Sequence, residues 1–156
     1  MPISSFILMK KILIAYYSRK EHTAQMAKYI AEGVRIGGCE AELRPISSLK
    51  AAADLQGYDG YIFGCPTYHR DMTENMKRFL FLADEANLSG KPGGAFGSST
   101  HSGEASGYIY DTMKHALHMQ VTGLGPFKLK EDEIEINLRS CQDYGRSISE
   151  MLMDAQ

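Results

Sequence analysis

The sequence has almost no net charge, few cysteines and no long apolar run, and each shortage excludes a class of protein. Its 19 acidic and 17 basic residues leave a formal net charge of −2, so it lacks the basic surface with which proteins bind nucleic acid or anionic membranes. The three cysteines, Cys39, Cys65 and Cys141, share no metal-binding spacing, which favours reduced thiols in a cytoplasmic protein. The apolar run that begins at Ile12 is too short to cross a bilayer.

A chain of 156 residues is long enough for one domain with a substantial core. At the amino terminus, Lys10 and Lys11 follow the apolar residues 6–8, whereas a signal peptide carries its positive charges before its apolar segment. We therefore expect residues 1–8 to be a disordered tail and residues 9–156 to form a single domain.

Short apolar runs alternate with helical patterns along the whole chain. The predicted strands cover residues 12–17, 40–44, 58–64 and 94–98, with a fifth strand in two pieces at 120–121 and 127–129. Five strands that alternate with helices predict a doubly wound α/β domain with a parallel sheet and a layer of helices on each face.

Apolar residues at helical spacing predict the helices between these strands. The first covers residues 23–36, and a short one lies near 48–55. The next opens with Asp71 and Glu74 in the arrangement of a capping box. The inner faces of this helix and the two after it carry Met76, Phe79, Leu80 and Ala83, then Ile109, Met113, Ala116 and Leu117, then Leu138, Cys141, Ile148 and Leu152.

Polar loops follow three of the predicted strands, at residues 18–23, 65–71 and 98–104. The carboxyl ends of parallel strands meet at one rim of the sheet, where the ligand crevice of such folds lies. Three of the five histidines, His22, His69 and His101, lie in these loops. The sequence therefore predicts a binding site at this rim.

The first loop joins a strand to the amino terminus of a helix, where free backbone N–H groups favour an anion. Ser18 and Thr23 add hydroxyl groups, and Arg19 or Lys20 can lie over a phosphate. The loop has neither a Gly-Lys-Ser/Thr sequence nor Gly-x-Gly-x-x-Gly, so a monophosphate suits it better than a dinucleotide. The alternative is that Ser18 and Thr23 only cap the helix.

Other site chemistries fit the sequence less well. The rim histidines come from three separate loops without a paired metal motif, which argues against a metal centre. Cys65 and Arg70 are separated by four residues, one fewer than a phosphatase loop needs. Residues 16–19, at the end of the first strand, include none of the carboxylates that a response-regulator receiver needs there, which excludes that class. His115 and His118 are expected to face solvent.

Three motifs in order resemble those of the flavodoxin-like FMN-binding family. Ser18-x-x-x-His22-Thr23 resembles the phosphate loop, and Gly64-Cys65-Pro66-Thr67-Tyr68 followed by Met72 resembles the second loop. The run from Ala95 to Ala105 resembles the third loop, especially that in the flavodoxin domains of flavodiiron proteins. Quinone reductases of the same superfamily share the first two loops. The resemblance spans about residues 10–153.

The resemblance implies a flavodoxin-like five-stranded sheet of order 2-1-3-4-5, with FMN at the rim. The phosphate would contact Ser18, Arg19, Lys20, His22 and Thr23. One side of the isoalloxazine would be wrapped by Pro66, Thr67, Tyr68 and His69, and the other side and its pyrimidine edge by Ser98, Ser99, Thr100, His101 and Gly103. The protein would position the flavin and tune its electronics.

Two departures from the family pattern affect the flavin. Glu21 occupies a position where the family usually has glycine; if that position needs a positive φ, glutamate costs about 1 kcal/mol. No tryptophan is present to stack on the ring, which leaves Tyr68 and His101 as planar groups. The alternative function is a non-redox phosphate- or nucleotide-binding module that has lost FMN affinity.

The predicted function is electron transfer through FMN, either as a carrier or as an NAD(P)H-dependent FMN or quinone reductase. The expected partners are a redox protein, or a small quinone and NAD(P)H, and the chain is a possible homo-oligomer. The near-neutral charge and the rim cations predict a less negative FMN potential than that of an acidic flavodoxin. His69 and His101 are candidate proton donors.

Overall fold

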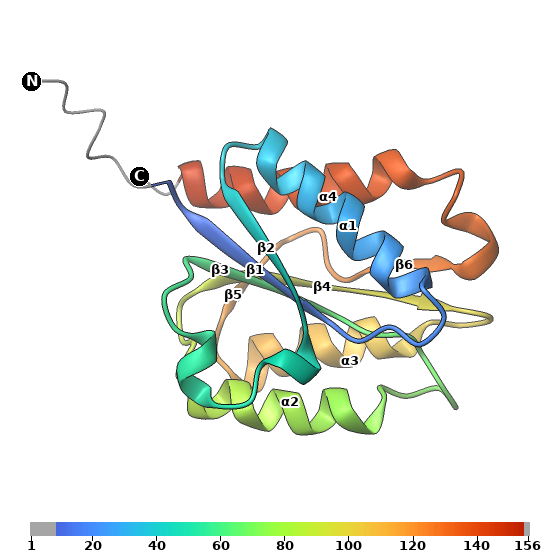
Figure 1. Cartoon of the computed structure of the whole chain (residues 1–156), viewed down its shortest axis with the longest axis horizontal. Helices are drawn as coiled ribbons and strands as arrows, with labels where there is room; N and C mark the ends of the chain where they lie inside the picture. The colour runs from blue at the N-terminus through green and yellow to red at the C-terminus, as the bar shows by residue number, and fades with distance from the viewer. Residues whose placement is uncertain (1–8, 155–156) are drawn as a thin grey trace, which may run out of the picture.

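The computed structural model describes residues 9–154, which form a parallel sheet between two layers of helices. Helices α1 (His22–Ile36) and α4 (Leu138–Asp154) cover one face of the sheet, and α2 (Glu74–Glu85) and α3 (Glu104–Asp111) cover the other (Figure 1). The tail predicted at residues 1–8 lies outside the described residues.

The sheet has the predicted strand order. Strand β1 (Lys11–Tyr16) lies between β2 (Glu40–Pro45) and β3 (Gly60–Gly64), and β3 pairs with β4 (Pro92–Ser99). Both β5 (Gln120–Val121) and β6 (Phe127–Lys130) pair with β4, so the last strand position is filled in two pieces. All pairings are parallel, which confirms the doubly wound 2-1-3-4-5 order.

Alternation along the central strands divides the core into two parts. In β1, Leu13 and Ala15 pack on the side of α2 and α3, while Ile12 and Ile14 pack on the side of α1 and α4. All of these side chains are fully buried. Because helices cover both faces, the four central residues of the strand, 12–15, are all apolar, as is typical of parallel sheets.

The beginning of α2 differs from the prediction. The helix begins at Glu74, and its N-cap is Thr73, whose hydroxyl accepts a hydrogen bond from the Met76 N–H at 3.4 Å. Asp71 lies before the helix and accepts from the Met72 N–H at 2.7 Å. The predicted Asp71–Glu74 capping box is therefore wrong, because Thr73 is the residue with the extended backbone that a cap requires.

Two other helical predictions need correction. The segment 48–55 forms two short 3₁₀ turns, η2 (Ile46–Ser48) and η3 (Ala52–Leu55), and β3 starts at Gly60 rather than 58. After α3 the chain continues as a π-helical turn, η4 (Thr112–Ala116). The wider turn leaves Ala116 exposed, whereas Met113 and Leu117 are buried as predicted.

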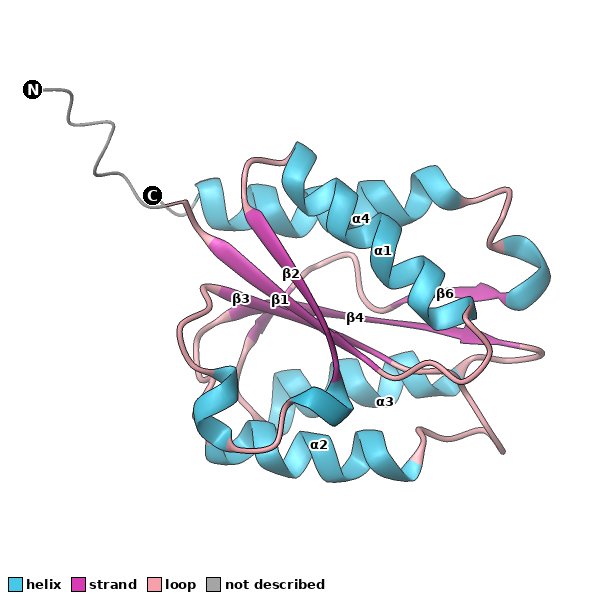
Figure 2. Cartoon of the chain, in the orientation of Figure 1, coloured by secondary structure: helices cyan, strands magenta, loops and turns pink. Residues whose placement is uncertain are grey.

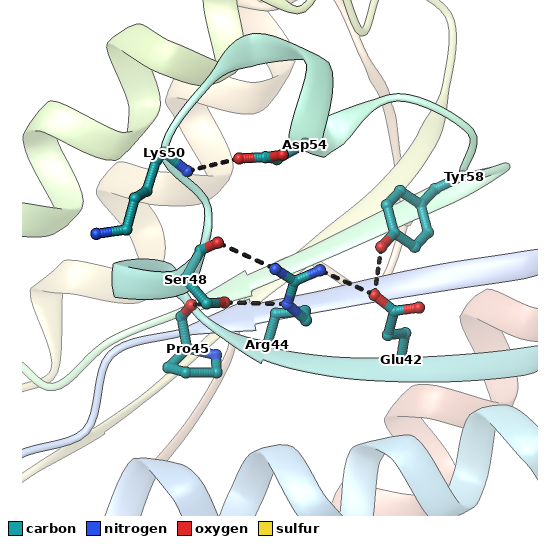
Figure 3. A network of polar contacts seen from close by, with 7 residues as sticks. All are labelled: Glu42, Arg44, Pro45, Ser48, Lys50, Asp54 and Tyr58. Atoms are coloured by element: carbon teal, nitrogen blue, oxygen red, sulfur yellow. Dashed lines mark hydrogen bonds and ion pairs between the residues drawn. The ribbon is translucent and has the colours of Figure 1, made fainter.

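A polar network holds the segment between β2 and β3 (Figure 3). The Arg44 guanidinium donates to the Ser48 hydroxyl and to its carbonyl oxygen, both at 3.0 Å, and to the Glu42 carboxylate at 3.2 Å. The Tyr58 hydroxyl donates to the same Glu42 oxygen at 2.5 Å. These contacts fasten the turns over the open edge of β2 and so replace the predicted helix.

No helix among residues 9–154 combines the length and the apolar composition needed to cross a bilayer.

Candidate functional site

The three polar loops follow the carboxyl ends of their strands (Figure 2), and hydrogen bonds join them. The hydroxyl groups of Thr23 and Ser98 lie 2.8 Å apart and link the first loop to the third. The Thr67 N–H donates to the Ser98 carbonyl at 3.0 Å and links the second loop to the third. The predicted meeting of these loops is therefore present.

The first loop leads into α1 with its N-terminal N–H groups at the rim. The Ser18 hydroxyl accepts from the Ala24 N–H at 3.1 Å, so Ser18 does cap the helix. Thr23 instead turns inward to Ser98, so the capping alternative holds for only one of the two hydroxyls. Glu21 has φ 70°, the left-handed conformation that glycine adopts without strain.

The second loop forms a tight hairpin turn at Tyr68–Asp71. The N–H of each end residue donates to the carbonyl of the other, at 3.1 and 3.0 Å. The central residues, His69 and Arg70, have φ 52° and 62°, as a type I′ turn requires at both positions. Their side chains are exposed at the tip. The backbone is therefore strained at a predicted flavin contact.

The end of the third loop contacts the second loop at Thr67 and packs against Lys128 at Gly103. The Thr67 hydroxyl accepts from the Ala105 N–H at 3.0 Å, at the beginning of α3. Gly103 has φ 72°, and a Cβ atom there would lie 3.2 Å from the Ser99 hydroxyl and 3.1 Å from Cδ of Lys128. The positive φ and the lack of space for a side chain both explain why glycine occupies position 103.

Two acidic groups at the rim lie beside basic side chains, whereas Glu21, Glu104 and several cations form no ion pair within residues 9–154. Asp71 lies 2.5 Å from the Lys77 ammonium, which lowers the pKa of the Asp71 carboxyl. Glu131 lies 3.5 Å from His22. Within residues 9–154, no ion pair includes Arg19, Lys20 or Arg70. The rim therefore presents unpaired positive charge.

Tyr68 lies beneath one of these cations. The Arg19 guanidinium is 5.9 Å from the centre of the Tyr68 ring, in the geometry of a cation–π contact. Burial raises the pKa of the Tyr68 hydroxyl. Arg19 was predicted to contact phosphate, and the structure places its guanidinium over an aromatic ring of the second loop.

The predicted site residues differ in how much of each reaches the surface. Buried residues are Thr23, Pro66, Ser98, Ser99 and Gly103; half-buried ones are Ser18, His22, Thr67 and Tyr68; exposed ones are Arg19, Lys20, His69, Thr100 and His101. The buried hydroxyls of Thr23 and Ser98 join two of the loops, while the exposed side chains are accessible to a ligand.

The last strand also contributes to this rim, which none of the three motifs indicated. Lys130 pairs in register with Ser99, which brings Lys128 and Glu131 beside the first and third loops. The predicted parallel strand at 127–129 could have indicated this contribution, because the carboxyl ends of all parallel strands lie at the same rim.

The remaining candidate chemistries find no support. Burial raises the pKa of the Cys65 thiol to about 11, which suppresses the thiolate that a phosphatase nucleophile needs. In the described part of the chain, no three His, Cys, Asp or Glu side chains are grouped as a metal site requires.

Comparison with known proteins decides the family. The profile of the flavodoxin family matches residues 14–140. The chain belongs to this family. It is 36% identical over 115 residues to a flavodoxin from Clostridium saccharobutylicum, over 73% of this chain and 70% of that one. It is 30% identical over 142 residues to an NAD(P)H dehydrogenase (quinone) from Gluconacetobacter diazotrophicus, over 74% of this chain and 71% of that one.

Solved structures agree with the flavodoxin assignment. A flavodoxin from the domain Archaea superposes with a TM-score of 0.85 at 25% identity, over 92% of this chain and 99% of that one. The flavodiiron protein from Giardia intestinalis gives a TM-score of 0.84 at 22% identity, over 92% of this chain and 36% of that one, which shows a shared fold. The predicted flavodoxin-like fold and FMN redox function are confirmed at the level of the family.

The residues at the rim fit the FMN of this family. A phosphate dianion suits the amino terminus of α1, where N–H groups without intrahelical partners lie beside Lys20 and Ser18. Gly103 leaves room for the third loop to approach closely, and Tyr68 and His101 provide planar groups. When bound, FMN supplies the electron-accepting and electron-donating chemistry, and the protein sets its position and potential.

Proposed function

We propose that this flavodoxin-family protein is a reductase that uses FMN to pass electrons from NAD(P)H to a quinone. The relative from Gluconacetobacter diazotrophicus carries this activity in its name and aligns with most of this chain. The observation that carries the proposal is the unpaired positive charge of Arg19, Lys20 and Arg70 at the rim.

Positive charge beside a flavin favours its reduced anionic form, because opposite charges stabilise one another. Of the nearby acids, Asp71 is paired with Lys77. Glu21 and Glu104 form no ion pair within residues 9–154 and oppose part of this field. Such a site supports transfer of an electron pair better than transfer of single electrons at very low potential. The rim is thus suited to a hydride donor and a quinone acceptor.

A one-electron carrier for a protein partner is the second candidate. It is favoured by the 36% identity to a named flavodoxin. The exposed tip of the second loop, with His69 and Arg70, offers a surface for a protein partner. The two candidates differ in whether nicotinamide nucleotides reduce the bound flavin directly.

The test begins with an absorbance spectrum of the purified protein before and after incubation with FMN and desalting. Retained flavin bands are expected, followed by bleaching when NADH or NADPH is added without oxygen, and recovery when a quinone is added. A yellow protein that neither nucleotide reduces would establish the carrier instead. A protein that stays colourless would favour the module that has lost FMN affinity and would overturn both redox candidates.

A further inference from the structure

A hollow of about 490 Å³ lies beside Tyr68. It is bounded by the first loop, the second loop and the beginning of α2. Its lining includes Tyr17, Arg19, Tyr68, Met72 and Arg78, and none of residues 98–103. The hollow therefore adjoins the predicted flavin site through Tyr68 and remains separate from the third loop.

Two arginines give the hollow its charge. Arg19 comes from the first loop and Arg78 from the second turn of α2, and neither takes part in an ion pair within residues 9–154. Asp71 and Glu74 also line it, but both face the Lys77 ammonium, at 2.5 and 3.5 Å. With the acids held by Lys77, the free charge in the hollow is positive.

The walls of the hollow suit a flat ring. Tyr17, Tyr68 and Met72 are half-buried and present apolar surface, while Thr73 and Asn75 add polar groups. Aromatic side chains favour stacked rings, and guanidinium groups favour phosphates through paired hydrogen bonds. A ligand that combines an aromatic ring with phosphate groups matches both features.

We propose that this hollow binds the adenosine-phosphate half of NAD(P)H, an inference that rests on the proposed reductase function. The nicotinamide half must reach the flavin to transfer hydride, and Tyr68 both lines the hollow and is a predicted flavin contact. The hollow therefore takes the other half of the dinucleotide, with Arg19 and Arg78 on its phosphates and Tyr17 beside the adenine.

The test measures binding of fragments that carry no nicotinamide, by calorimetric titration of 2′,5′-ADP and 5′-ADP into the FMN-loaded protein. Arg78→Gln is expected to weaken the binding of both fragments about tenfold, the loss of one charge-assisted contact. Arg35→Gln is the matched control, because Arg35 is exposed at the far end of α1 and bonds only the Ala41 carbonyl, at 3.2 Å. Circular dichroism and thermal melting of the variants confirm that both are folded.

The outcomes separate this proposal from the function on which it rests. Fragment binding that falls in Arg78→Gln and not in Arg35→Gln supports the hollow, and stronger binding of 2′,5′-ADP identifies NADPH as the donor. If NAD(P)H reduces the flavin and its KM is unchanged in Arg78→Gln, the hollow does not bind NAD(P)H, and the reductase function stands. The same conclusion follows if NAD(P)H reduces the flavin and neither fragment binds. Arg78-dependent fragment binding without flavin reduction overturns the reductase and the donor role of the hollow.

Discussion

Thr23 and Ser98 share a hydrogen bond of 2.8 Å between their hydroxyl groups, inside the protein and 75 residues apart in sequence. Each side chain has 1% of its surface exposed. Both were predicted as flavin contacts, and the structure gives them the task of fixing the first loop to the end of β4. The position of the phosphate loop therefore depends on a contact between two loops.

We expect Thr23→Val and Ser98→Ala each to lower the free energy of unfolding by about 1–3 kcal/mol, since each leaves the other hydroxyl buried without a partner. The double variant is expected to be less destabilised than the sum of the two, because it removes both polar groups. Urea unfolding of the four proteins measures this coupling. Simple addition of the two effects would show that the bond contributes nothing to stability.

Replacing Glu21 by glycine is expected to stabilise the protein by up to about 1 kcal/mol, because Glu21 has φ 70° and glycine adopts that conformation without strain. The same change removes a negative charge from the phosphate loop and should tighten FMN binding. Glu21→Gln removes the charge and keeps the strain. A fluorescence titration with FMN and urea unfolding of both variants separates the effects. Equal stability of Glu21→Gly and Glu21→Gln would contradict the strain argument.

Tyr58→Phe is expected to change the pH dependence of stability at both ends. The hydrogen bond from Tyr58 lowers the pKa of the Glu42 carboxyl below 4.5, so its contribution is present above that pH and is lost as the pH falls. Burial, aided by the bond to Glu42, raises the pKa of Tyr58 from 10.0 to about 12, so its contribution is lost as the pH rises across that interval.

The difference in unfolding free energy between the parent protein and Tyr58→Phe should therefore be greatest between these limits. Urea unfolding at a series of pH values measures it. Tyr108→Phe serves as the control, since Tyr108 is 46% exposed on α3. If the difference in unfolding free energy does not vary with pH, the hydrogen bond between Tyr58 and Glu42 shown in Figure 3 is not its cause.

His69→Gln and His101→Gln test the proposed proton donors of the flavin site. Both side chains are exposed at the rim, where an imidazole can exchange protons with solvent. We expect at least one variant to change the slope of the FMN midpoint potential with pH, measured by spectroelectrochemical titration. His115→Gln is the control, because His115 is exposed on η4 away from the rim. Unchanged slopes in both rim variants would exclude these residues as donors.

The sequence predicted those features that periodicity and chain order determine. Alternation of strands and helices predicted a doubly wound parallel sheet, and the resemblance to the flavodoxin-like family implied its strand order. The residues Gly-Leu-Gly-Pro at 123–126 indicated the break between β5 and β6. Glycine at position 21 in related loops indicated the positive φ of Glu21, which the structure confirms.

Features that depend on tertiary contacts were missed. The spacing of Asp71 and Glu74 predicted a cap at Asp71, whereas the cap at Thr73 and the ion pair of Asp71 with Lys77 are visible only in the fold. The hollow beside Tyr68 joins Arg19 to Arg78 across 59 positions of sequence, so no spacing rule could indicate it. Likewise, the place of Glu131 beside His22 follows from the pairing of β6 with β4.

The Tyr68–Asp71 hairpin was missed because its central residues are not those that the turn prefers. Type I′ turns favour Asn-Gly, and here His69 and Arg70 adopt positive φ instead. The combined change His69→Asn with Arg70→Gly is expected to raise the free energy of unfolding by about 1 kcal/mol, after allowing for the greater freedom of glycine in the unfolded chain. Urea unfolding measures the gain.

The same change removes a positive charge from the rim, and so should make the FMN potential more negative. Arg70→Gln removes the charge and keeps the positive φ, and is expected to shift the potential without the gain in stability. A gain in stability in the double variant, together with the same shift of potential in both, would show that the strain and the charge of this turn act separately. No gain would mean that the surrounding contacts, including Asp71 with Lys77, already offset the strain.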